Sequence, residues 1–274
     1  MSKLMKADIY RMVKSRLTLV ALIMVLAFPV LMVLMYLGIQ AIAGVGDEME
    51  EAVTLFTANS LIGSIYSMTN NVGLVIPAFA GILVCSDYTN GTLRNKVIAG
   101  NRRTQIYLSH LIVSILFCVV MITIYAAMTT GLALIFFDFA KDESENFGRE
   151  VLYFVLNGTM SFVFVSTVTT FFAMVLRNIA PTIIFTIVFT IALMAITSVV
   201  SLLDYESYKY AVYFIPTFIS NFFNLSSFSL LDLLGTTSEG SRELMFAEGM
   251  LSYVFFGAVN TVAGVIIFNK RDIK

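Results

Sequence analysis

Six long stretches without a charged side chain constrain this chain more than any other feature. Each is long enough to supply the roughly 20 apolar residues with which a helix crosses the hydrocarbon core of a bilayer. The mean hydropathy is +0.88 and only 13% of the residues are charged, which is far from the composition of soluble domains. We therefore predict an all-α integral membrane fold with six transmembrane helices. The six stretches are Leu17–Ile39, Leu61–Cys85, Thr104–Phe137, Val151–Leu176, Asn178–Leu203 and Gly249–Asn269.

The charged residues are segregated between the two sides that these spans define. With the N-terminus in the cytoplasm, 13 of the 17 basic residues lie on the cytoplasmic side and 15 of the 18 acidic residues lie in the outer loops. Basic residues near span ends mark the cytoplasmic side of a membrane protein. The pattern predicts a multi-pass protein of the plasma membrane with both termini in the cytoplasm.

One further apolar stretch, residues 211–234, could form a seventh crossing, but Pro216 and several polar residues interrupt it. A seventh crossing would also move the basic tail from Lys270 to Lys274 to the outside, against the positive-inside rule. We interpret it as a re-entrant or interfacial segment within an outer loop at 204–248, before the last span. Its backbone would need protein around it, because unpaired peptide groups are not tolerated against lipid.

Residues 1–16, before the first span, alternate basic side chains with Leu4, Met5, Ile9, Met12 and Val13 at helical spacing. A basic amphipathic helix of this kind lies on the membrane interface. The alternative is a basic segment that only fixes the orientation of the first span.

Several kinds of chemistry have no support in the sequence. The spans contain no Asp, Glu, Lys or Arg, so transport coupled to an ion gradient is disfavoured. His110 is the one side chain there that titrates near neutral pH, and we expect it to pack through hydrogen bonds. No lysine lies in a phosphate-binding G-x-x-x-x-G-K-[ST] context. Cys85 and Cys118 lie in apolar stretches and are interpreted as buried small side chains, so we expect no metal site and no catalytic residue.

An intramembrane aspartyl protease is a weaker alternative. Gly44, Gly46 and Asp47 match a short G-x-G-D pattern, but this chemistry requires two carboxylates that share one site. Asp87 is the only aspartate close to the end of the second span, and the predicted topology places it on the opposite side of the bilayer from Asp47.

The cytoplasmic loop at 86–103 carries the most specific pattern. Asn90 and Gly91 predict a turn, Thr92 can cap a helix and Gly100 can end it, which gives a short helix from about Thr92 to Ala99. On such a helix we expect Leu93, Val97 and Ile98 on one side and Arg94 and Lys96 on another, an arrangement that suits docking into the groove of a partner. The alternative is a basic loop that only sets the topology.

This loop resembles that of the permease subunits of type-2 ATP-binding-cassette exporters. In that family the second span is followed by an acidic residue, a Gly-Thr-Leu-Arg-like stretch and a basic turn before the third span. Here the matching positions begin at Asp87, where the family more often has glutamate, and continue through residues 91–94 to the turn at 101–104. The layout of the whole chain, as a single permease domain over residues 1–274, is similar too.

The resemblance implies a mechanism in which the loop docks as a coupling helix on a separate ATPase subunit. The implied assembly has two ATPase chains, which bind ATP and Mg²⁺, and a second permease chain that is the same or homologous. This chain itself would hold no cofactor, lie in membrane lipid and bind no nucleic acid. The implied coupling residues are Asp87, Gly91, Thr92, Leu93, Arg94, Lys96, Val97, Arg102 and Arg103.

In this family the second and fifth spans tend to line the substrate path. Polar side chains on these spans of the present chain are candidates for that path, although small polar residues also commonly join membrane helices through packing. The candidates are Ser67, Asn70, Asn71, Thr186 and Thr190. A path without charges suits a hydrophobic or amphipathic substrate, such as a peptide, drug or lipid, and export of this kind would give resistance to drugs or antimicrobial peptides. The alternative function is a non-transporting scaffold or sensor subunit.

Overall fold

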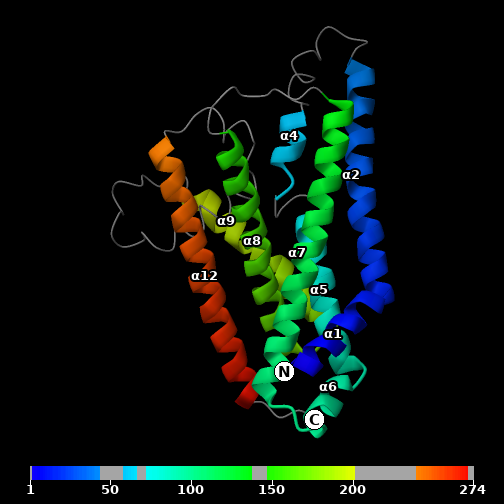
Figure 1. Cartoon of the computed structure of the whole chain (residues 1–274), viewed down its shortest axis with the longest axis vertical. Helices are drawn as coiled ribbons and strands as arrows, with labels where there is room; N and C mark the ends of the chain where they lie inside the picture. The colour runs from blue at the N-terminus through cyan, green and yellow to red at the C-terminus, as the bar shows by residue number, and fades with distance from the viewer. Residues whose placement is uncertain (1, 44–57, 67–71, 138–146, 201–238, 271–274) are drawn as a thin grey trace.

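The structure is a computed structural model that describes residues 2–43, 58–66, 72–137, 147–200 and 239–270. Within these ranges the regular secondary structure is entirely helical, as predicted (Figure 1). The helices are α1 (Ser2–Lys14), α2 (Arg16–Ala43), α4 (Ala58–Gly63), α5 (Val72–Thr89), α6 (Thr92–Ile98), α7 (Arg103–Phe136), α8 (Phe147–Leu176), α9 (Ile179–Val200) and α12 (Glu239–Lys270).

Five helical stretches in the described residues are long and apolar enough to cross a membrane, which identifies a multi-pass membrane protein. They are Arg16–Ile39, Val72–Thr89, Arg103–Phe136, Val151–Leu176 and Met250–Lys270. The fifth predicted span corresponds to α9, where the apolar stretch found is the shorter Ile179–Leu193. Six spans therefore remain a prediction. The predicted re-entrant segment lies outside the described residues.

The second predicted span is wrong in one respect, because it is not one continuous helix from Leu61. The helix α4 ends at Gly63 and a turn follows. The Ser64 hydroxyl donates to the Leu61 carbonyl at 2.8 Å and the Ile65 amide donates to the Ile62 carbonyl at 3.1 Å. Such short-range bonds compete with the helical pattern and end α4, and the next described helix is α5 from Val72.

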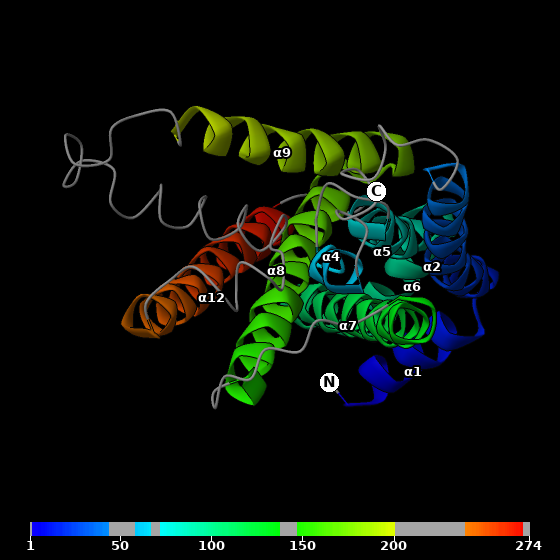
Figure 2. The ribbon, with the colours of Figure 1, turned by 90° about the horizontal axis from the view of Figure 1, so that it is seen from above.

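Helix α8 lies at the centre of the bundle, in contact with α5, α7, α9 and α12 (Figure 2). Phe162 on α8 and Phe117 on α7 are among the fully buried side chains of the apolar core. Glycines let helices approach closely: Gly158 on α8 lies against Tyr66, and Gly264 on α12 lies against Tyr107. Small residues commonly have this role where lipid removes the usual hydrophobic advantage of helix association.

The N-terminal segment forms a separate helix, α1, which meets α2 at an angle (Figure 1). The bend is at Ser15, whose hydroxyl accepts a hydrogen bond from the Leu17 amide at 3.2 Å, as a helix N-cap does. Helices α1 and α6 lie at the same end of the bundle as the end of α12 at Lys270. The Arg103 guanidinium, at the start of α7, donates to the Asn269 carbonyl at 3.0 Å. The first and last described helices, α1 and α12, therefore meet this end of the bundle, α1 along its length and α12 at Lys270.

Candidate functional site

Helix α6 is the short helix that the loop pattern predicts, and it ends one residue earlier than expected. Gly91 has a φ of 67° and occupies the N-cap position, and Gly100 has a φ of 84° just after the helix. These left-handed conformations favour glycine because it has no Cβ. The predicted cap by Thr92 is wrong: its hydroxyl instead donates to the Asp87 carbonyl at 3.2 Å, which ties α6 to the end of α5.

The orientation of α6 differs from the predicted one. Leu93 is 1% exposed and packs with Ile106 and Phe268 in the bundle, and Lys96 also faces inward with a side chain only 13% exposed. Arg94 is exposed, and Ile98 is 73% exposed. Residues 93 and 96 share the inner face because positions three apart lie on the same side of a helix. The sequence pattern placed Lys96 at an outer rim because it did not reveal the carboxylates beneath it.

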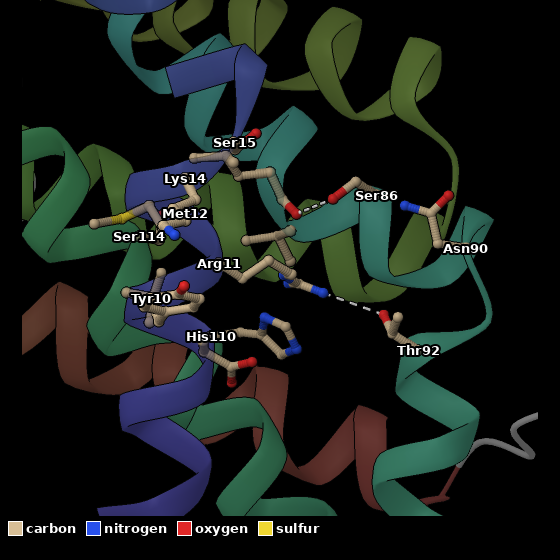
Figure 3. A pocket seen from close by; sticks show the side chains of 14 residues that line it. Tyr10, Arg11, Met12, Lys14, Ser15, Ser86, Asn90, Thr92, His110 and Ser114 are labelled. Atoms are coloured by element: carbon tan, nitrogen blue, oxygen red, sulfur yellow. Dashed lines mark hydrogen bonds between the residues drawn. The ribbon is translucent and has the colours of Figure 1, made fainter. Parts of the chain in front are cut away.

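Lys96 joins three helices through its ammonium group. The Nζ atom lies 2.7 Å from Oδ1 of Asp8 on α1 and 2.7 Å from Oδ2 of Asp87 at the end of α5. The other oxygen of Asp87, Oδ1, forms an ion pair with the Arg11 guanidinium of α1. Arg11 Nη1 also lies 3.2 Å from the Thr92 hydroxyl at the start of α6 (Figure 3). Two carboxylates and two cations thus form a balanced group, which we call the charge cluster.

Helix α7 closes the charge cluster with two polar side chains. The Ser109 hydroxyl donates to Oδ2 of Asp8 at 2.7 Å. The Nε2 atom of His110 lies 3.1 Å from Asp87 Oδ2 and 3.2 Å from Lys96 Nζ. Four of the residues that meet here are at least 97% buried, namely Asp8, Asp87, Ser109 and His110. Since buried charges are tolerated only when they are paired and hydrogen-bonded, the charge cluster fixes α1, α5, α6 and α7 relative to one another.

The charge cluster alters the acid–base properties of its members outside the spans. Burial alone would raise the pKa of Asp8, but hydrogen bonds from Lys96 and Ser109 outweigh this effect and hold the pKa below the ordinary 3.8. Burial lowers the pKa of Lys96 from 10.5, against the opposing effect of Asp8. Asp8 is therefore ionised at neutral pH, and separating it from Lys96 would leave a charge buried without a partner.

The predicted coupling residues fall into two groups. The side chains of Asp87, Leu93 and Lys96 point into the bundle, whereas Arg94 and Arg102 are exposed. The remaining predicted residues lie at helix starts or are partly buried. Gly91 and Thr92 begin α6, Arg103 begins α7, and Val97 is partly buried. The sequence pattern did not predict Asp8, Arg11 or Ser109 as part of the site. The only available signal was Asp8, an acidic residue in an otherwise basic amphipathic segment.

Both carboxylate oxygens of Asp87 are bound by cations, which leaves this aspartate without a free oxygen for the acid–base work of a protease. Asp47, the other residue of that hypothesis, lies outside the described residues. Within the described residues, no group of three His, Cys, Asp or Glu side chains could hold a metal ion.

Two of the five candidate path residues are in the described part of the chain. Thr186 and Thr190 are 3% and 4% exposed, and their hydroxyls donate to the carbonyls of Thr182 and Thr186 at 2.8 and 3.0 Å. This geometry matches the packing alternative, and a role in a substrate path remains a prediction. Ser67, Asn70 and Asn71 lie outside the described residues.

Comparison with protein families gives a match over residues 6–193 to the family described as ABC-2 family transporter protein. The matched range covers more than half of the chain and includes every residue of the charge cluster. A comparison with curated proteins gives no match.

Proposed function

The chain belongs to the ABC-2 transporter family, and on that premise we propose that it is the membrane-spanning subunit of an ATP-driven exporter. Its ATPase is a separate chain, since the sequence has no phosphate-binding loop of its own. ATP and Mg²⁺ belong to that partner. The assembly has two ATPase chains and two permease chains, which are identical or homologous.

The observation that supports this proposal best is that α6 is bound to the bundle through one face and exposed on the other. Its inner face is held by Leu93 in the apolar core and by Lys96 in the charge cluster. Its outer face presents Arg94 and the 73% exposed Ile98 at the end of the bundle. An apolar side chain beside a cation suits a groove with a charged rim. A force applied to this face passes directly to α1, α5 and α7.

The orientation follows from charge. Basic side chains gather at the bundle end that carries α1 and α6, and basic residues near spans mark the cytoplasmic side. Both termini and the coupling helix are therefore cytoplasmic, where ATP is available. The substrate is hydrophobic or amphipathic, because the charged residues of the spans lie only at or near the span ends and none lies in the middle to bind an ion or a strongly polar solute.

Co-purification and transport test the proposal together. Tagged chain, expressed with the ATP-binding-cassette ATPases of its source, should recover one of them, and Ile98→Asp and Arg94→Ala should lower that recovery. Arg16→Ala is the matched control, since Arg16 is an exposed arginine at the same end of the bundle but on α2.

In inverted vesicles, ATP-dependent uptake of a fluorescent amphipathic peptide should fall with the two α6 variants and not with Arg16→Ala. Recovery of no ATPase, together with no ATP-dependent uptake by the unaltered chain, would favour a scaffold or sensor subunit.

A further inference from the structure

A cavity of about 420 Å³ lies between α1, α5 and α7, beside the charge cluster (Figure 3). Its volume is within the range of small-molecule sites. Helix α1 contributes Tyr10, Arg11 and Lys14 to its lining, α5 contributes Leu83 and Val84, and α7 contributes Val113 and Ser114. None of these residues except Arg11 belongs to the charge cluster.

The two cations that α1 contributes to the lining, Arg11 and Lys14, can each bind a further group. Lys14 forms no ion pair with an acidic side chain among the described residues, and its ammonium lies 4.9 Å from the centre of the Tyr10 ring. Arg11 uses Nη1 for Asp87 and Thr92, whereas a guanidinium carries five donors. Arg11 and Lys14 are three positions apart on α1 and share one face. Asp8 also lines the cavity, but Lys96 and Ser109 bind its two oxygens.

The charges around the cavity do not cancel. Arg11, Lys14 and Lys96 carry three positive charges, Asp8 and Asp87 carry two negative charges, and His110 is counted as neutral. One positive charge is therefore left over, and it lies on the side of the cavity where Lys14 is exposed. A ligand with a single negative charge would balance it.

The inner wall contains an unsatisfied polar group. Ser114 is 2% exposed, lines the cavity, and its hydroxyl has no hydrogen-bond partner. An unpaired buried hydroxyl is costly, and a hydroxyl can donate to an anionic oxygen at this position. The cavity thus has cations at its outer side and a free donor at its inner side.

The α5 side of the lining becomes apolar with depth. Asn90 lies at the end of the bundle, and Leu83 lies seven residues earlier on α5, about 10 Å deeper at 1.5 Å per residue. Such a change from polar to apolar over about 10 Å matches the boundary between headgroups and acyl chains, where amphipathic helices lie. Leu83 and Val84 belong to a membrane-spanning stretch.

We propose that this cavity, between α1, α5 and α7, binds a phosphate group with a single negative charge, as in the headgroup of an anionic phospholipid. Arg11 and Lys14 bind the phosphate oxygens, Ser114 donates from the inner wall, and the apolar wall of Leu83 and Val113 contacts the start of the acyl chains. Inorganic phosphate shares the binding chemistry without the apolar part. Because the inference uses neither an ATPase nor a transported substrate, it is independent of the proposed function.

Native mass spectrometry of the purified full chain tests the proposal. Phosphatidylglycerol should bind more tightly than phosphatidylcholine with the same acyl chains. Lys14→Ala should weaken phosphatidylglycerol binding about fivefold, the effect expected of one basic side chain near an anionic lipid surface. Ser114→Leu, which fills the inner wall without changing charge, should remove the preference between the two lipids. Lys6→Ala is the control, since Lys6 is exposed on the same helix but does not line the cavity.

The outcomes separate the two sources of phosphate. Tight binding of phosphatidylglycerol that inorganic phosphate does not displace assigns the site to lipid. Binding of inorganic phosphate that Lys14→Ala weakens, without a lipid preference, assigns it to the free ion. Equal binding of both lipids with no phosphate binding overturns the proposal, and so does an equal effect of Lys6→Ala and Lys14→Ala. Since Lys14 is on the surface, its variant keeps the test valid even if Ser114→Leu does not fold.

Discussion

The ammonium of Lys96 on α6 lies 2.7 Å from the carboxylate of Asp8 on α1, although 88 positions separate them in the chain. The same ammonium reaches Asp87 on α5 at an equal distance. One side chain therefore connects the proposed docking helix to the N-terminal helix and to a membrane span. A helix held in this way can transmit movement from a partner subunit to the bundle, because it cannot shift without moving α1 and α5.

Replacing Lys96 tests this connection. Lys96→Met leaves Asp8 without its ion-pair partner and should cost about 3–5 kcal/mol, the usual effect of breaking a buried ion pair from one side. The readout is thermal stability of the purified chain in detergent. Arg94→Met, on the exposed face of the same helix, is the control and should change stability by no more than about 0.5 kcal/mol.

A double variant separates the ion pair from general packing. Asp8→Asn removes the second charge, so Asp8→Asn with Lys96→Met should be less destabilised than the sum of the two single variants, because contacting residues are not additive. Simple additivity would show that the 2.7 Å contact contributes nothing beyond the two separate sites.

Acidification should release α1 through Asp8. Its pKa is lowered in the folded chain from the ordinary 3.8, so its ionised form stabilises the fold. That contribution is complete above the unfolded pKa and is lost as the pH falls through 3.8 and then through the lower folded pKa. Hydrogen exchange of the α1 amides should therefore accelerate on acidification from about pH 5 to about pH 3, relative to the intrinsic exchange rate. Asp8→Asn should show a weaker dependence, and an unchanged dependence would exclude Asp8 as the titrating group.

The sequence predicted the helical class, the short helix α6 and six spans, of which five are found in the described residues, because charge-free length and glycine turns are local signals. It did not predict which face of α6 is buried. That depends on Asp8 and Asp87, which approach Lys96 only after α1 folds against α5 and α7. The break after Gly63 was missed for a similar reason, since hydropathy alone does not reveal that Ser64 bonds to the Leu61 carbonyl.

The contact between α7 and α12 should be sensitive to a single methyl group. A Cβ at Gly264 would collide with the ring of Tyr107, and Tyr107 is fully buried with neighbours packed around it. We expect Gly264→Ala to destabilise the chain by about 1–3 kcal/mol, as overpacking does. Gly257→Ala on the same helix is the matched control, since the nearest side-chain atom to its Cβ, on Thr167, is 4.0 Å away. Thermal unfolding of the two variants in the same detergent should separate them, and equal stabilities would show that Tyr107 has room to move.

The threonines of α9 offer a choice between packing and a substrate path. The hydroxyls of Thr186 and Thr190 bond to carbonyls of their own helix, which have helical partners already, so valine can replace either threonine at nearly the same volume. If packing is their role, Thr186→Val and Thr190→Val should cost less than about 1 kcal/mol each, about the net contribution of one hydrogen bond, because the carbonyls keep their helical partners. Transport should then keep its rate and its order of preference among amphipathic peptides.

If the hydroxyls contact the substrate, stability should still hold while that order of preference changes, because the loss of a hydrogen bond weakens the binding of polar substrates more than that of apolar ones. Measuring stability and substrate preference on the same purified variants distinguishes the two roles, since stability should hold in both cases and only a path changes the order of preference.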